Sequence, residues 1–399
     1  MVIARRLAPT RIGCMSLSPS TALARDLIRR PSVTPADAGA LDVLRAFLKE
    51  AGFFCLRKIF TEPGTPDVDN LFAKMGDGAP HFVFAGHTDV VPPGDLKRWR
   101  HDPFGGEIES GRLWGRGASD MKGAVAAFAV AARDFVAERG IPKGAISFLI
   151  TGDEEGASIN GTAKLLDWAK DYGERFDHCV VGEPSNSLAL GDTIKIGRRG
   201  SLSGRVTIEG VQGHVAYPEQ ADNPVPKMAR LVAALSGHRF DEGSAHFGPS
   251  NLEFTSIDVG NPAVNVIPAQ ARAAFNIRFN DLWTPERLED EIRVIATQTV
   301  GAAAELDFAP CNARAFLTKP GDFVALVSRA VEEETGRKPE LSTTGGTSDA
   351  RFIVRDCEVL EFGLINETIH KIDENAALDD IDRLTKIYRR LLELYFEGP

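Results

Sequence analysis

The chain has few cysteines, and nothing in their spacing suggests pairs. The five among its 399 residues are scattered, with no Cys-x-x-Cys spacing: Cys14, Cys55, Cys179, Cys311 and Cys357. A disulfide framework or a zinc site built on thiolates is therefore not expected. Sparse, unpaired cysteines are typical of a reducing compartment, so we expect a cytoplasmic protein.

Long apolar runs and an excess of positive charge are also lacking. The longest nearly unbroken apolar segment, residues 123–132, is well short of the ~20 residues that a membrane-spanning helix needs. The formal net charge of −10 argues against a nucleic-acid-binding protein, which would need a concentrated basic face. With 43% hydrophobic and 26% charged residues, the composition is that of an ordinary soluble globular protein.

The first 19 residues differ from those that follow, because they contain arginines but no acidic residue. A short organelle-type presequence is one interpretation of this pattern. We expect instead that residues 1–19 are a disordered extension, with Met15 as a plausible start.

From Ser20 onward, helical and strand patterns alternate. Residues 81–87 and 144–151 have the pattern of buried strands, and residues 121–140 that of an alanine-rich helix. Further helices are predicted at 35–52, 160–173 and 321–336, and further strands within 178–185 and 358–371. This alternation predicts an α/β fold with a mostly parallel sheet flanked by helices.

The pattern changes near Gly200. Residues 200–219 alternate in polarity like an antiparallel strand with one exposed face. Two more strands and two helices are predicted after it, at 251–260 and 270–280 and at 223–237 and 284–300. We therefore predict an α+β domain, residues 200–312, inserted into a first domain made of residues 20–199 and 313–399.

Histidine and acidic residues recur where the predicted strands end. The clusters are His87 with Asp89, Asp153-Glu154-Glu155, Glu183 and His370, and Asp120 lies in the turn before the alanine-rich helix. Ligands of open parallel sheets bind at the carboxyl ends of the strands. One cluster alone would most simply be a solvated strand end. Five would place two imidazoles and several carboxylates in one crevice, which needs cations for neutralisation, and these donor types suit zinc and similar metals.

These clusters resemble, in order and spacing, those of the M20 peptidase family of co-catalytic di-zinc amidohydrolases. The resemblance covers nearly the whole chain from about Thr21 onward and extends to nine motifs: GRGASDMKG, TGDEEG, VGEPS, KIGRRGSLSG, GHVAYP, NVIP, FLTKPG, GGTSDARF and INETIHK. Together they are similar to the branch of the family that hydrolyses the amide bond of N-succinyl-L,L-diaminopimelate, a step in the synthesis of lysine and cell-wall precursors. The family also implies a catalytic domain with an inserted dimerisation domain.

The resemblance implies a ligand set for two zinc ions per subunit, with cobalt possible in one site. Asp120 would bridge the two ions. His87 and Glu183 would complete one site. Glu155 and His370 would complete the other.

Catalytic roles follow from the same resemblance. Glu154 would be the general base, and Asp89 would accept a hydrogen bond from the free nitrogen of the ligand His87. His214 would reach the active site of a partner subunit and stabilise the oxyanion, which implies a homodimer built through residues 200–312. A cis peptide is implied after Asp120.

The implied substrate carries carboxylates at both ends, and the chain offers donors for them. Arg198 and Arg278 could grip carboxylates bidentately, and the glycine-rich segment with Gly346 and Thr347 resembles a backbone anion cradle. The resemblance adds Tyr217 and Asn265 from the partner subunit. The remaining histidines are expected on loops or on the surface: His81, His101, His178, His238 and His246.

Other functions stay open at this point. An acetylornithine deacetylase, an aminoacylase or a carboxypeptidase of the same fold would share the metal residues, and only GRRGSLSG, FLTKPG and GGTSDARF argue against them. A non-catalytic binding homologue would have lost Glu154 or a metal ligand, and the sequence retains all of them.

Overall fold

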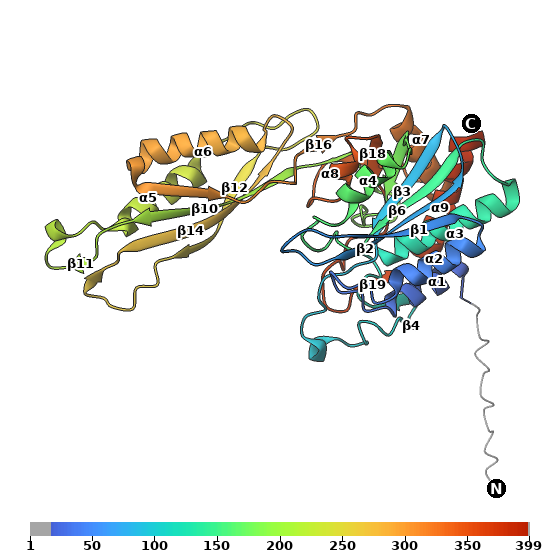
Figure 1. Ribbon diagram of the computed structural model, residues 1–399, viewed down its shortest axis with the longest axis horizontal. Coiled ribbons are helices and arrows are strands. Elements are labelled where there is room, and N and C mark those ends of the chain that lie inside the picture. Colours follow the sequence, from blue (N-terminus) through green and yellow to red (C-terminus); the bar gives the residue numbers. More distant parts are fainter. Residues whose placement is uncertain (1–16, 398–399) are drawn as a thin grey trace, which may run out of the picture.

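The computed structural model describes residues 17–397. Figure 1 shows two lobes along the long axis of the molecule. The larger lobe contains the first and last described elements, and the smaller one is built from the middle of the sequence. Within the described residues, no helix combines the length and the apolar character needed to cross a membrane.

An eight-stranded sheet forms the centre of the larger lobe. Its strands lie in the order β1 (Phe54–Phe60), β2 (Val68–Gly76), β6 (Ala145–Thr151), β3 (His81–His87), β7 (His178–Val181), β18 (Glu358–Glu361), β8 (Thr193–Lys195) and β17 (Glu340–Ser342). The middle strands β6, β3, β7 and β18 are parallel, as are β8 and β17, whereas β1, β2 and the β18–β8 pairing are antiparallel. The carboxyl ends of the four middle strands therefore meet at one edge.

Helices cover both faces of this sheet, which explains why its central strands are apolar on both sides. In β3, Phe82 and Phe84 pack into the larger core, while Val83 and Ala85 face the opposite core. Five helices belong to the first core: α1 (Pro19–Ile28), α2 (Ala40–Glu50), α3 (Lys122–Arg139), α7 (Asp322–Thr335) and α9 (Leu378–Glu397). The second core includes side chains of α4 (Thr162–Asp171) and α8 (Ala350–Ile353).

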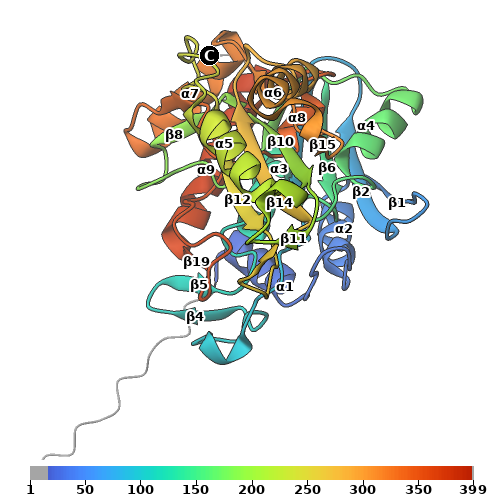
Figure 2. The same cartoon turned by 90° about the vertical axis from the view of Figure 1, so that its left-hand side faces the viewer.

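The smaller lobe has a sheet and a hydrophobic core of its own. Its antiparallel strands follow the order β12 (Asn251–Asp258), β14 (Gln270–Phe279), β10 (Gly200–Glu209) and β15 (Ala304–Phe308). Helices α5 (Pro224–Gly237) and α6 (Pro285–Val300) pack against one face. Figure 2 looks along the long axis from the end of this lobe.

Short pairings complete the structure. Strand β9 (Gly197–Arg198) pairs with β16 (Phe316–Leu317) where the chain passes between the lobes. Strand β11 (Gly213–His214) pairs with β13 (Val266–Ile267) at the far tip of the smaller lobe. A small sheet joins β4 (Glu107–Glu109), β5 (Arg112–Trp114) and β19 (Asn375–Ala377), and three 3-10 turns lie at Leu96–Arg98, Pro218–Gln220 and Gly301–Ala303.

The predicted fold class, a mostly parallel sheet flanked by helices with an α+β segment in the middle of the chain, is confirmed. Ordered structure begins earlier than predicted: Ser18 caps α1 by accepting a hydrogen bond from the backbone N–H of Thr21, and Pro19 is already helical. Residues 1–16 of the predicted extension, with Met15, lie outside the described residues.

Candidate metal centre and active site

The sheet brings the predicted site residues to one edge. His87 is the last residue of β3 and pairs with Thr151, the last residue of β6. Glu154 and Glu155 lie in the turn that follows β6, and Glu183 follows the neighbouring parallel strand β7. This arrangement confirms that these strand ends converge.

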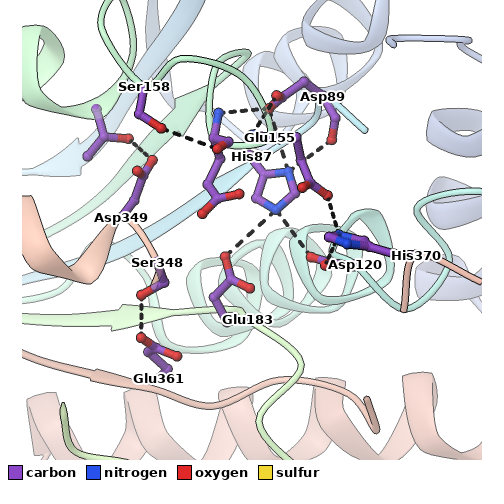
Figure 3. A network of polar contacts seen from close by, with 12 residues as sticks. His87, Asp89, Asp120, Glu155, Ser158, Glu183, Ser348, Asp349, Glu361 and His370 are labelled. Atoms are coloured by element: carbon purple, nitrogen blue, oxygen red, sulfur yellow. Dashed lines mark hydrogen bonds and ion pairs between the residues drawn. The ribbon is translucent and has the colours of Figure 1, made fainter. Parts of the chain in front are cut away.

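Asp120 lies between the two predicted histidine ligands, with one carboxylate oxygen facing each (Figure 3). Its Oδ1 is 3.2 Å from His87 Nε2. Its Oδ2 is 3.3 Å from His370 Nε2. The predicted cis peptide between Asp120 and Met121 is confirmed. A carboxylate placed in this way can serve two cations at once.

A further carboxylate lies beside each of the two histidines. Glu155 Oε1 is 3.0 Å from His370 Nε2, and Glu183 Oε1 is 3.7 Å from His87 Nε2. The sequence predicted that His370 directly follows a strand. In the structure it lies in the loop between β18 and β19, and its side chain is half exposed.

The donor set fits divalent metals. Among residues 17–397, two groups of three residues have ligand atoms within 4.8 Å of one another, His87 with Asp120 and Glu155, and His87 with Glu154 and Glu183. Glu183 Oε1 is buried and has no hydrogen-bond partner within the described residues. Burial, and then the negative charges of Asp120 and Glu154, raise the pKa of Glu183 well above its usual value. Crowded carboxylates beside imidazoles are characteristic of sites for zinc and related cations.

Asp89 does not bind His87 in the way the sequence suggested. His87 Nδ1 lies 2.9 Å from the backbone carbonyl of Asp89, whereas the closest carboxylate oxygen is 3.6 Å away. The buried carboxylate instead accepts hydrogen bonds from the backbone N–H groups of Glu154 (3.3 Å) and Glu155 (3.0 Å). Asp89 thus holds the turn that carries the predicted base and a predicted ligand.

Glu154 lines a cavity together with the predicted metal ligands Asp120, Glu155, Glu183 and His370. Burial raises the pKa of its carboxyl group well above the usual value, and the negative charges of Asp349, Glu155 and Asp120 add to this effect. A carboxylate of raised pKa accepts a proton more readily near neutral pH.

The cavity has a volume of about 410 Å³, and it combines the metal-ligand residues with positive and amide donors. Lys195 and Arg198 line it together with Thr344, Gly345, Gly346 and Thr347. Gly345 has φ +106°, and a side chain there would collide with the Arg198 guanidinium. The GGT segment therefore needs glycine in order to approach Arg198 so closely.

Arg198, which was expected to grip a carboxylate of the substrate, already pairs with a carboxylate of its own chain. It is buried and forms an ion pair with the fully buried Glu361, whose oxygens lie 3.0 and 2.8 Å from Arg198 Nε. Lys195 donates to hydroxyls instead, to Ser342 (3.0 Å) and Thr344 (2.8 Å). Lys195 is thus the less neutralised cation of this cavity, and sequence reasoning missed it although it stands in the quoted motif KIGRRGSLSG.

Arg278 lines a second cavity, of about 300 Å³, whose lining residues come from both lobes. Glu154, Thr347 and Arg351 line the same cavity. Arg351 is a further cation that sequence reasoning did not single out, although GGTSDARF contains it. The Nε and one terminal nitrogen of Arg351 are buried without a hydrogen-bond partner within the described chain.

His214, Tyr217 and Asn265 are not near this site within one chain. All three belong to the tip of the smaller lobe, where the backbone N–H of Val215 donates to the carbonyl of Asn265. The rings of His214 and Tyr217 are exposed and lie 5.8 Å apart. Within this chain, the structure gathers the three residues at this tip.

Comparison with known proteins adds a family match, to "Peptidase family M20/M25/M40", over residues 83–394. The chain belongs to this family. This confirms the family resemblance of the sequence motifs. Among curated members of the family, a succinyl-diaminopimelate desuccinylase of Methylocella silvestris is 61% identical over 378 residues, which are 94% of this chain and 97% of the relative. One of Methylobacterium nodulans is 61% identical over 380 residues, 94% of this chain and 96% of the relative.

Solved structures of the M20 family share the fold. An M20 metallo-carboxypeptidase of Sulfolobus solfataricus aligns with a TM-score of 0.76 at 16% identity, over 95% of this chain and 99% of that one. The YXEP protein of Bacillus subtilis, described as a dinuclear metal-binding peptidase, aligns with a TM-score of 0.70 at 16% identity, over 95% and 98%.

Proposed function

We propose that this chain is an amidohydrolase that cleaves N-succinyl-L,L-diaminopimelate to succinate and L,L-diaminopimelate. The observation that carries the substrate assignment is the 61% identity, over 94% of the chain, to proteins named succinyl-diaminopimelate desuccinylase. The donor set at the sheet edge supports the reaction type. This activity belongs to the synthesis of lysine and cell-wall precursors, and we place it in the cytoplasm.

The residues that would hold the metals are the predicted five. Two zinc ions, with cobalt possible in one site, would be bridged by Asp120. One ion would also contact His87 and Glu183, and the other Glu155 and His370. When bound, such ions lower the pKa of water toward ~7 and polarise the amide carbonyl.

Glu154 performs the proton transfers. Its carboxylate accepts the proton of the attacking water and then delivers it to the nitrogen of the leaving amine. The turn that carries it is held by Asp89, which fixes the position of Glu154 relative to Glu155.

The two cavities beside this centre fit the charges of the substrate. Lys195 and Arg198, with Gly346 and Thr347, would bind one terminal carboxylate. Arg278 on the other lobe would bind a carboxylate at the second cavity. Because Glu361 neutralises Arg198, Lys195 would supply most of the positive charge for this carboxylate.

We further propose a homodimer in which residues 200–312 provide both the contact and part of the partner's active site. His214 would donate to the developing oxyanion, and Tyr217 and Asn265 would contact the substrate. Their common position at an exposed tip supports this arrangement.

The activity is tested with purified protein stripped by a chelator and then supplied with zinc. The stripped protein is expected not to release diaminopimelate from N-succinyl-L,L-diaminopimelate, and two equivalents of zinc are expected to restore the release. Absence of hydrolysis of any N-acyl amino acid after zinc addition would contradict the enzyme assignment.

The dimer is tested by mixing two inactive variants, His214→Ala and Glu154→Ala. A mixed dimer would have one site with both residues, so random exchange should recover roughly a quarter of wild-type activity. A mixture that stays as inactive as its components, after exchange of subunits has been verified, would contradict delivery of His214 from the partner.

A further inference from the structure

A buried ion pair lies behind the metal-ligand residues. Arg116 and Glu374 are 2% and 0% exposed, and Arg116 NH1 lies 2.7 Å from Glu374 Oε2. Arg116 precedes Asp120 in the chain, and Glu374 follows His370. The loop that carries Asp120 therefore supplies the positive charge of this pair, and the loop that carries His370 supplies the negative charge.

Glu374 holds the Asp120 loop through its backbone. Its Oε1 accepts hydrogen bonds from the N–H groups of Gly117 (3.1 Å), Ser119 (3.0 Å) and Asp120 itself (3.1 Å). Its backbone carbonyl also accepts from the N–H of Gly115 at 2.9 Å. A single carboxylate thus fixes the approach to the residue predicted to bridge the metals.

Arg116, from the loop that carries Asp120, in turn holds the loop that carries His370. Its NH1 donates to the backbone carbonyl of Lys371 at 3.1 Å, and its NH2 lies 3.5 Å from that of His370. His370 has φ +58°, a conformation that is uncommon for residues other than glycine and that the surrounding structure must maintain.

We propose that Arg116 and Glu374 are positioning residues that set the distance between Asp120 and His370. Through this distance they would set the zinc affinity of the site formed by Asp120, Glu155 and His370. Because the two contacts are reciprocal, loss of either charge releases both loops. Neither side chain is among the residues that line the cavity or form the ligand groups within the described chain. Their effect is therefore indirect. The inference rests on the proposed ligand set.

The experiment measures zinc binding to the chelator-stripped full chain by calorimetry, which does not depend on turnover. Wild type should bind two ions with two resolvable dissociation constants. Glu374→Gln keeps the size of the side chain but removes its charge. It is expected to raise one of the two zinc dissociation constants by 10-fold or more, since loss of residues that hold metal ligands in place typically lowers metal affinity 10–100-fold.

The matched control is Glu174→Gln. Glu174 is also a largely buried carboxylate with a lysine partner, Lys74 at 2.9 Å, and it lies near the amino end of β7, away from the site. This variant should lower the melting temperature yet keep both zinc constants within threefold. Equal constants in wild type and Glu374→Gln would overturn the inference.

A second variant covers the case in which Glu374→Gln does not fold. Arg116→Lys keeps the charge beside Glu374 but removes the guanidinium that spans the two carbonyls. It should also weaken one zinc constant, and unchanged constants would equally overturn the inference. A wild-type protein that binds fewer than two ions would instead contradict the metal centre itself.

Discussion

The Asp89 carboxylate offers a sharp test of how the metal centre is held. Asp89→Asn preserves shape and one acceptor oxygen, but its amide nitrogen must face one of two backbone N–H groups, those of Glu154 and Glu155. A donor then meets a donor in a site that is 1% exposed. The substitution should displace the turn rather than remove a ligand.

The magnitude follows from the lost interaction. A hydrogen bond to a charged group contributes about 1.5–3 kcal/mol. If displacement of Glu154 and Glu155 removes this much stabilisation from the transition state, kcat/KM should drop by roughly 10- to 150-fold, at about 1.4 kcal/mol per factor of ten. Zinc binding should weaken less than turnover, because Asp120 and the two histidines remain in place.

The assay pairs kcat/KM on N-succinyl-L,L-diaminopimelate with zinc titration of the same preparation. Asp153→Asn is the matched control, since Asp153 is also buried and accepts two backbone N–H groups, those of Ile159 (2.8 Å) and Asn160 (2.9 Å). It should lose stability but keep most of its activity. An Asp89→Asn enzyme within twofold of wild type, or one that binds no zinc while folded, would refute the reasoning.

Three further predictions concern single residues. Glu154→Ala should keep both zinc ions and lose 10²-fold or more in kcat; loss of zinc in a metal assay would mean that Glu154 is a ligand. Arg198→Met should lower the free energy of unfolding in urea by about 3–5 kcal/mol, because Glu361 is left charged and buried; a loss below 1 kcal/mol would contradict the ion pair. Burial lowers the pKa of His81, so near pH 6.5 the unfolded chain takes up a proton that the native protein does not. The free energy of unfolding should therefore fall as the pH drops through about 6.5. Its slope against pH should be shallower in His81→Asn, and equal slopes would exclude this contribution.

The sequence predicted those parts of the site that depend on local pattern. Strand periodicity placed His87 at the end of a strand, and the rule for carboxyl ends of parallel strands then placed Glu155 and Glu183 beside it. Helix α3 was predicted from its long alanine-rich run, and helix α6 from a charged segment with apolar residues at helical spacing. Helix α9 was not predicted, although residues 378–397 carry apolar residues at helical spacing and seven of them are buried.

Contacts between distant segments could not be predicted. The partner of Arg198 is 163 residues away in the chain, and no local pattern marks Glu361 as its counter-ion. His81 was expected on a loop or on the surface, but it begins strand β3 and is 3% exposed. Its ring lies 2.9 Å from the carbonyl of Arg175 and 2.7 Å from the hydroxyl of Ser147. The family resemblance implied that the Asp89 carboxylate accepts from His87, whereas in the structure the backbone carbonyl of Asp89 faces His87 and the carboxylate accepts from the Glu154 and Glu155 backbone.

The most direct test of the central claim is a comparison of kcat/KM for N-succinyl-L,L-diaminopimelate and for N-acetylornithine with the zinc-loaded enzyme. The account predicts a preference of at least 10²-fold for the succinylated substrate, because Lys195 in one cavity and Arg278 in the other present positive charge beside the catalytic centre. Equal values, or a preference for N-acetylornithine, would contradict the proposed function.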